Sequence, residues 1–274
     1  MAKKGRHITS LISHYFGKFA RHPFPSLIQH AINLSYVKLM GVDMSRFRDP
    51  CTYKTLNEQF CRPLEVEMPM PRAKSKVISA VDALITDTGK ITEGKAYQIK
   101  GMDYKIDALF GDHHEGLVKK VEGGVYINFY LSPKDYHRYH MPMDLKIHSA
   151  THIPGKLYPV NFPFLRHKKD LFIENERVVI ECEDKKGRTH VLVLVGALNV
   201  GKMVLTFEPR IKTNSEIREP QHYTYSNLQL DRGELFGWFE MGSTIVMFSQ
   251  KGSFAPEVAI NQKVMFGDVI GRLK

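Results

Sequence analysis

The chain has 274 residues, of which 43% are hydrophobic and 25% are charged. These proportions are typical of a folded globular protein and exclude an intrinsically disordered chain. The length suffices for one large domain or for a domain with an appendage. The formal net charge of +10 favours an anionic partner, such as a nucleic acid, an anionic lipid or an acidic substrate.

The positive charge is concentrated at the N-terminus. Residues 1–41 contain no Asp or Glu and six basic residues, which are Lys3, Lys4, Arg6, Lys18, Arg21 and Lys38. The rest of the chain is only mildly basic. This distribution argues against a nucleic-acid groove along the whole chain, and we expect no nucleic-acid partner.

Cysteine content and hydropathy narrow the class of protein further. The chain has an odd number of cysteines, which are Cys51, Cys61 and Cys182, and no CxxC pair. We therefore expect a reducing compartment and neither a disulfide framework nor a zinc site. No apolar run approaches the roughly 18–20 residues of a membrane-spanning helix. Because Lys18 and Arg21 interrupt the apolar part of the N-terminus, we expect no secretory signal.

The N-terminal segment is predicted to form helices. Apolar residues between Ile8 and Phe19 recur at the spacing of one helical face, with lysine and histidine side chains opposite. Two prolines follow this helix, and further helices are expected over 27–40 and near 55–60. The apolar face suits either a membrane interface or the protein's own core. The lack of acidic residues favours the membrane.

The remainder is predicted to be mostly β. Apolar or β-branched runs bounded by Gly, Pro, Asp or Asn indicate strands at 77–85, 124–130, 177–182, 190–195 and 243–248. The tail at 263–271 is similar to the tight turn before the last strand of barrel-sandwich hybrids of the lipoyl-carrier type. We therefore predict an α+β protein, with a helical, basic, membrane-interface segment over 1–66 and a mostly β domain over 67–274.

Several histidines and acidic residues could bind a metal or activate a nucleophile. His137 and His140 are three residues apart, but a third ligand and the HExxH pattern are missing. The run at 112–115 lies between glycines and is predicted to be a solvated loop, so we expect no metal site. Asp82, His140 and Ser243 form a candidate triad, because a serine hydroxyl needs a histidine base and a carboxylate to orient it. The Gly-x-Ser-x-Gly elbow of α/β-hydrolases is absent.

Two longer blocks resemble the phosphatidylserine decarboxylases. They are YLSPKDYHRYHMP at 130–142 and FEMGSTIVMF at 239–248, and further similar blocks lie at 53–64, 155–161, 175–178 and 195–201. The resemblance covers nearly the whole chain from about Gly41. In that family a Gly-Ser bond breaks itself and the serine becomes a pyruvoyl cofactor. The resemblance therefore implies a self-processing enzyme that needs neither pyridoxal phosphate nor a metal.

The resemblance places the processing site near the C-terminus. The self-cleaving serine falls on Ser243 and the cleaved glycine on Gly242, so that the chain would divide into residues 1–242 and 243–274. The family commonly has Leu before Gly-Ser-Thr, whereas this chain has Met241, an apolar residue of similar volume that we expect to be tolerated.

Three further residues receive roles from the resemblance. The triad histidine falls on His140, and His137 matches a histidine implicated in decarboxylation. The triad aspartate falls on Asp82. The family commonly has Ala-Asp-Gly there and this chain has Val-Asp-Ala, so Asp87 stays open as the alternative acid.

The implied reaction is decarboxylation of phosphatidylserine to phosphatidylethanolamine and CO2 by a peripheral enzyme on the cytoplasmic face of the inner membrane. The implied partners are phosphatidylserine, an anionic membrane surface and the two cleavage chains as a heterodimer, with a dimer of heterodimers left open. The residues expected to bind the membrane are Lys3, Lys4, Arg6, Ile8, Leu11, Ile12, Phe16, Lys18 and Phe19. Two alternatives stay open: a pyruvoyl decarboxylase of a soluble amino acid, and a non-catalytic membrane-binding β-domain.

Overall fold

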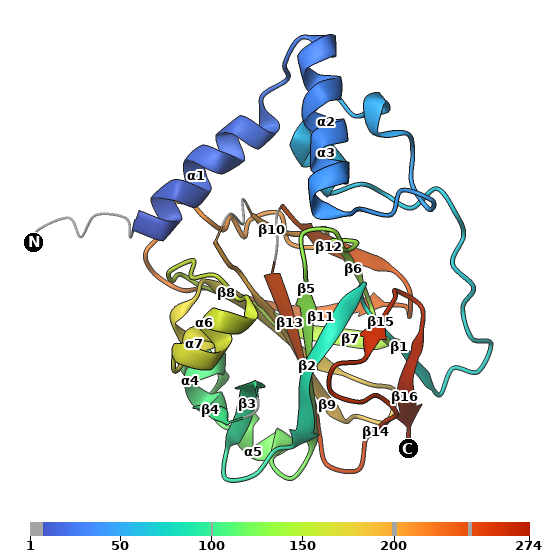
Figure 1. Ribbon diagram of the computed structural model, residues 1–274. Coiled ribbons are helices and arrows are strands. Elements are labelled where there is room, and N and C mark those ends of the chain that lie inside the picture. The colour runs from blue at the N-terminus through green and yellow to red at the C-terminus, as the bar shows by residue number, and fades with distance from the viewer. Residues whose placement is uncertain (1–7, 100, 199–201, 241–242) are drawn as a thin grey trace, which may run out of the picture.

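The computed structural model describes residues 8–99, 101–198, 202–240 and 243–274 (Figure 1). The first elements are α1 (Ile8–Arg21), α2 (Ser26–Met40), a 3-10 turn η1 (Pro50–Thr52) and α3 (Leu56–Phe60). α2 ends at Gly41, whose φ of 65° is a left-handed conformation that glycine adopts without steric cost. The hydroxyl of Thr55 caps α3 by accepting from the N–H of Glu58. These helices agree with those predicted from the sequence.

The three helices share a small core of their own. Ala20, Tyr36 and Phe60 are buried in one cluster, and Trp238 from the β body packs against it. In Figure 1 the helices stand above the sheets, joined to them by the extended segment that follows α3. Within the described residues, no helix is long and apolar enough to cross a membrane.

An eight-stranded antiparallel sheet forms the body of the protein. Its strand order is β11-β7-β8-β9-β13-β5-β2-β15. In chain order, the strands are β2 (Ala83–Lys90), β5 (Val125–Leu131), β7 (Leu145–Ile153), β8 (Arg177–Glu183), β9 (Thr189–Val195), β11 (Gln221–Leu230), β13 (Ser243–Ser249) and β15 (Lys263–Val264). The result is an α+β architecture that is mostly β, as predicted.

The segment predicted as one strand over 77–85 is in fact two strands. β1 (Lys76–Ile78) pairs with β16 (Val269–Leu273), whereas β2 pairs with β5 in the main sheet. The chain crosses between the sheets at 79–82, where the Ser79 hydroxyl donates to the Val81 carbonyl at 2.6 Å. Apolar composition alone does not reveal such a crossing, because both parts are buried.

Smaller elements cover the two faces of the main sheet. One face packs on two three-stranded sheets, one of β1, β16 and β14 (Phe254–Pro256), the other of β10 (Met203–Leu205), β12 (Leu235–Phe239) and β6 (Arg138–His140). The other face packs on short helices and a hairpin. These are β3 (Lys95–Ile99), β4 (Met102–Lys105), α4 (Ile106–Phe110), η2 (Asp112–His114), α5 (Leu117–Val121), α6 (Phe162–His167) and α7 (Leu171–Glu174).

β13 lies in the middle of this arrangement. It is hydrogen-bonded to β9 on one side and to β5 on the other, and each of its residues is buried. Ile245 and Met247 belong to the core on one face, while Val246 and Phe248 belong to the core on the other, which is the alternation expected of a strand. Ser243 is the first residue of this strand.

Candidate functional site

Ser243 carries a buried hydroxyl with no hydrogen-bond partner among the described residues. Its backbone is fixed by pairing with Leu131 of β5. The next residue, Thr244, also has a buried, unpartnered hydroxyl. Buried polar atoms are nearly always satisfied, so two such hydroxyls at one strand end mark a place of chemical interest. Gly242, the predicted cleaved glycine, and Met241 lie outside the described residues.

His137 is held in one tautomer by the turn before β6. Its ring is fully buried, and Nδ1 lies 2.8 Å from the carbonyl oxygen of Asp135. Because a carbonyl only accepts, Nδ1 carries the proton and Nε2 is left with a free lone pair. Nε2 is buried and has no partner in the part of the chain that the structure describes. Burial lowers the pKa of His137 to about 3, so the ring is neutral at neutral pH.

His140, at the end of β6, is fixed through both ring nitrogens. Nδ1 donates to the Gly233 carbonyl at 2.8 Å, and Nε2 accepts from the Tyr136 hydroxyl at 2.9 Å. The ring stacks on Phe266 with centroids 3.8 Å apart. Burial lowers the pKa of His140 to about 4. His140 is therefore a neutral imidazole whose basic nitrogen is turned to a hydroxyl.

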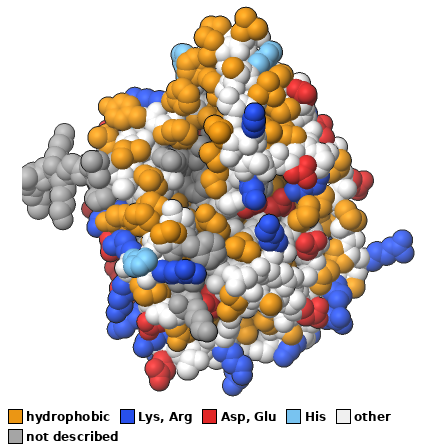
Figure 2. Space-filling model, in the orientation of Figure 1, with side chains coloured by type: hydrophobic (Ala, Val, Ile, Leu, Met, Phe, Trp, Pro, Cys, Tyr) orange, Lys and Arg blue, Asp and Glu red, His pale blue; other side chains and the backbone are white. Residues whose placement is uncertain are grey.

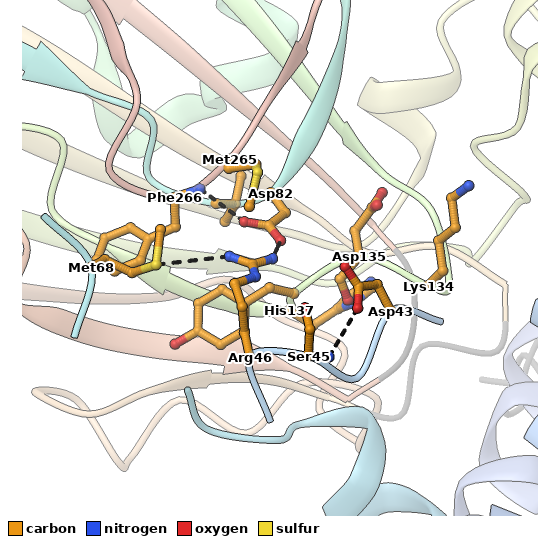
Figure 3. A network of polar contacts seen from close by, with 12 residues as sticks. Asp43, Ser45, Arg46, Met68, Asp82, Lys134, Asp135, His137, Met265 and Phe266 are labelled. Carbon is orange, nitrogen blue, oxygen red and sulfur yellow. Dashed lines mark hydrogen bonds and ion pairs between the residues drawn. The ribbon is translucent and has the colours of Figure 1, made fainter. Parts of the chain in front are cut away.

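Asp82 lies beside this pair on the chain that crosses between the sheets. One carboxylate oxygen accepts from the Phe266 N–H at 2.8 Å, and the other forms an ion pair with Arg46 (Figure 3). Asp87, the alternative acid, instead accepts from the Tyr126 hydroxyl at 2.7 Å, and burial raises its pKa. Across the described ranges, no hydrogen bond joins Asp82 to His140 or His140 to Ser243.

Backbone contacts nevertheless join the segments that carry these residues. The N–H of His140 donates to the Ala80 carbonyl at 2.9 Å, two residues before Asp82. Phe239 lies four residues before Ser243, and its N–H donates to the His137 carbonyl at 2.9 Å. The sequence analysis missed Tyr136 and Phe266 as contacts of His140. Tyr136 lies in the same sequence block, but nothing in the sequence indicates that the tail returns to this place.

A cavity of about 420 Å³ opens beside Asp82. Tyr130 and Ser132 line it, and these two residues flank Leu131, the backbone partner of Ser243. The charged residues of its wall are Asp43, Arg46, Arg62, Asp82, Lys134, Asp135 and Lys263. Figure 3 shows Lys134 and Asp135 beside the segment that carries His137. The wall therefore offers charges of both signs close to the candidate site.

Arg62 is the most deeply buried of these cations, at 1% exposed. It donates to the carbonyls of Gln59, Lys134 and Asp135, and within the described residues no carboxylate lies within ion-pair distance of it. Burial lowers the pKa of Arg62. A buried cation that lacks a counter-ion favours an anion in the neighbouring cavity.

The helices expose a large apolar surface. Figure 2 shows hydrophobic side chains gathered over the upper part of the molecule, where α1 and α2 lie. Of the predicted membrane residues, Leu11, Ile12, Lys18 and Phe19 are exposed, and Phe16 is half-buried against the helical core. Lys3, Lys4, Arg6 and the side chain of Ile8 lie outside the described residues. The sequence analysis missed Leu27, Ile28, Leu34 and Leu39 of α2, of which Leu27 is 85% exposed.

The run at 112–115 is largely solvated, as predicted, since Asp112, His113 and Glu115 are exposed and only His114 is buried. Asp112–His114 forms the short helix η2, and the buried ring of His114 hydrogen-bonds to the Thr151 hydroxyl at 2.8 Å. Over the ranges that the structure describes, no group of three or more His, Cys, Asp or Glu is arranged to hold a metal ion. The burial of His114 against β7 is the one feature of the run that the prediction did not include.

Comparison with known proteins shows similarity along the whole chain. The family model described as phosphatidylserine decarboxylase matches residues 56–272. A protein named phosphatidylserine decarboxylase proenzyme from Helicobacter pylori strain J99 is 43% identical over 96% of this chain and 97% of its own length. A protein of the same name from Campylobacter jejuni is 42% identical over 94% of this chain and 97% of its own length. One from Anaeromyxobacter is 35% identical over 95% of this chain and 93% of its own length.

Proposed function

The chain belongs to the phosphatidylserine decarboxylase family, and we propose that it converts phosphatidylserine to phosphatidylethanolamine and CO2 after cutting its own backbone between Gly242 and Ser243. The observation that carries this proposal is the buried hydroxyl of Ser243 at the start of the central strand, which has no hydrogen-bond partner within the described residues. A nucleophile for self-cleavage must be free of competing partners and fixed in place. Ser243 meets both conditions.

Self-cleavage consumes the serine. The Ser243 oxygen attacks the Gly242 carbonyl carbon, the peptide C–N bond breaks, and an ester with a free amine replaces the peptide. Loss of the Ser243 α-proton then breaks the Cβ–Oγ bond, which releases the Gly242 carboxylate and leaves dehydroalanine. Addition of water to dehydroalanine releases ammonia and yields the pyruvoyl group at residue 243. That group supplies a ketone, which binds the substrate amine and accepts the electrons released with CO2.

We assign the removal of the Ser243 proton to His140. Its Nδ1 is protonated and its Nε2 is basic, as a general base requires. The Tyr136 hydroxyl, which now occupies Nε2, would give way to Ser243 as the base acts. Asp82 supports His140 through Phe266, whose N–H it binds and whose ring stacks on the imidazole. Phe266 therefore acts as a positioning residue in this proposal.

We assign the proton transfers of decarboxylation to His137. The ring is neutral, and its Nε2 is buried without a hydrogen-bond partner within the described residues. Nε2 can therefore exchange a proton with a neighbouring reacting atom, because water does not compete for it. Its Nδ1 proton is tied to the Asp135 carbonyl, which fixes the ring plane. A buried imidazole with one free nitrogen is suited to a single directed proton transfer.

We place the substrate headgroup in the cavity beside Asp82. The phosphodiester is anionic, and Arg46, Arg62, Lys134 and Lys263 line the cavity wall. Arg62, which has no described carboxylate partner, offers the phosphodiester a counter-charge. The cavity also reaches Tyr130 and Ser132, beside the backbone partner of Ser243. A headgroup in this place would have its amine near the start of β13.

The helical segment is proposed to hold the enzyme on the bilayer as a peripheral protein of the cytoplasmic face of the inner membrane. Leu11, Ile12 and Phe19 of α1 would enter the interface together with Leu27 and Leu39 of α2, all of which are exposed. Apolar side chains on α1 and α2 supply burial, and the basic N-terminus adds attraction to anionic lipid of about 1 kcal/mol per charge. A lipid substrate requires such docking, because its headgroup stays at the interface.

Both cleavage products would stay together as a heterodimer. β13 begins the short product, residues 243–274, and lies between β9 and β5 with all its residues buried. The likeness of the tail to lipoyl carriers rests on the turn between β15 and β16, where Gly267 has a φ of 93°. The short chain would therefore remain held by the pairing of β13 with β5 and β9, of β15 with β2 and of β16 with β1.

The deciding experiment compares the intact mass of the purified protein with that of Ser243→Ala. We expect two fragments divided between Gly242 and Ser243, the smaller with a pyruvoyl end, and an uncut variant. CO2 release is then measured from phosphatidylserine vesicles and from free amino acids. CO2 release only from amino acids would mean that the substrate is a soluble amino acid and not the lipid. A wild-type chain that is never cut would overturn the proposal.

A further inference from the structure

An ion pair connects the first helix to Glu240, the residue that directly follows β12 and precedes the proposed cleavage site. Nη1 of Arg21, the last residue of α1, lies 2.6 Å from the carboxylate of Glu240. Glu240 is two residues before Gly242 and three before Ser243. The two partners are 219 residues apart in sequence, so a contact between the helical segment and the processing segment is built into the fold.

Two further contacts hold the same strand end to the helices. The Cys61 thiol, at the end of α3, donates to the Phe239 carbonyl at 3.4 Å. Trp238 packs against the helical core that contains Ala20 and Phe60. On its other side, the Glu240 N–H donates to the Lys202 carbonyl at 2.8 Å. Glu240 is thus fixed from both sides, with Arg21 as the partner of its side chain.

The position of this contact matters for the chemistry. Attack by a serine oxygen on a neighbouring carbonyl depends on the orientation of that carbonyl, and a misplacement of about 1 Å can slow a reaction about 100-fold. The carboxylate of Glu240 is 12% exposed and Arg21 is 35% exposed. The pair is therefore partly buried, so water screens it less than it screens a surface pair, and it holds the backbone at Glu240 in one orientation.

We propose that Arg21 is a positioning residue for self-cleavage, which acts through Glu240 on the carbonyl that Ser243 attacks. This inference rests on the proposed self-processing function. It assigns to α1 a second task beside membrane docking: the helix holds the chain in the geometry required for cleavage. Arg21 contacts neither the substrate nor the reacting atoms, so decarboxylation by protein that has already been cut does not depend on it.

The test measures the rate at which freshly purified precursor is converted into the two chains, followed by intact mass. We expect Arg21→Glu and Glu240→Arg each to slow conversion by about tenfold or more. The double variant Arg21→Glu/Glu240→Arg should recover most of the rate, because the pair is restored with its charges exchanged. Lys38→Ala is the matched control: it removes an exposed cation from α2 and should cleave as the wild type does.

The unfolding temperature of each variant is measured beside its cleavage rate. Slower cleavage with an unchanged unfolding temperature, and recovery in the double variant, support positioning. Equal loss in Lys38→Ala, or no recovery in the double variant, overturns it. If the wild type is cut and the Arg21 variants are cut at the same rate, this inference alone fails. If the wild type is not cut, the proposed function fails with it.

Discussion

The imidazole of His140 is stacked on the ring of Phe266, with ring centroids 3.8 Å apart and ring planes inclined by 20°. The backbone N–H of the same phenylalanine donates to Asp82 at 2.8 Å. Asp82 and His140 are therefore parts of one packed unit, although no direct hydrogen bond between them is described. Asp87 instead faces the Tyr126 hydroxyl.

This arrangement separates the two candidate acids. Asp82→Asn should slow self-cleavage by about 100-fold or more, because it removes the charge that holds Arg46 and weakens the support of His140. Asp87→Asn should cleave within a fewfold of the wild-type rate. Both rates are measured by intact mass on freshly purified precursor. The reverse order of the two effects would make Asp87 the triad acid.

Substitution of His137 and substitution of His140 should impair different steps of the reaction. His140→Ala should remain an uncut precursor, because it lacks the base for Ser243. His137→Ala should be cut yet release CO2 from phosphatidylserine at least 100-fold more slowly, a typical loss for a general acid or base. Mass spectrometry reports the first step and CO2 release per pyruvoyl group reports the second. An uncut His137→Ala protein would contradict this division of roles.

The helices and most strands could be predicted from the sequence because their cores follow simple periods. β13, for example, alternates between two buried faces. The break between β1 and β2 could not be predicted, because 77–85 is mostly apolar on both sides of the crossing and its two parts join different sheets. Residue chemistry alone gave Asp82, His140 and Ser243 as one of many possible triads, and the roles of Ser243, His140, His137 and Asp82 came from family resemblance. The contacts of Phe266 and Arg21 depend on long-range packing, on which local sequence carries no information.

Gly237 of β12 is predicted to be intolerant of any side chain. A Cβ at this position would lie 1.9 Å from the Val204 carbonyl oxygen and 2.3 Å from the Tyr139 ring. Gly237→Ala should lower the free energy of unfolding by about 3 kcal/mol, and it should slow cleavage because β12 leads to Glu240. Gly89→Ala is the control, since its Cβ would meet nothing closer than 3.4 Å. Chemical denaturation measures both, and equal losses would refute the steric explanation.

Stability should fall in mild acid because of the two buried histidines. The pKa is about 3 for His137 and about 4 for His140 in the folded protein, against 6.5 for an unperturbed histidine. The unfolded state therefore binds more protons below pH 6.5. The free energy of unfolding that each neutral ring contributes is complete above pH 6.5. It declines by about 1.4 kcal/mol per pH unit for each ring as the pH falls toward the pKa of that ring in the folded protein.

Urea denaturation at pH 7 and pH 5 measures this effect. The wild type should lose about 2 kcal/mol per buried histidine between the two conditions. His137→Gln should show a pH dependence smaller by about that amount, because one of the two rings no longer titrates. The same pH dependence in wild type and variant would mean that folding does not lower the pKa of His137.

The cavity beside Asp82 should contribute to substrate binding through charge. Lys134 is exposed and lines the cavity, so its removal should leave the fold and self-cleavage intact. Lys134→Ala should raise the KM for phosphatidylserine in mixed micelles by about fivefold to tenfold with kcat little changed, because a charge-assisted contact to phosphate contributes roughly 1–1.5 kcal/mol. Lys251→Ala, which removes an exposed cation at the far end of β13, serves as the control. A fall in kcat with KM unchanged would place Lys134 in the chemical step, and equal effects of the two variants would indicate general attraction to anionic micelles.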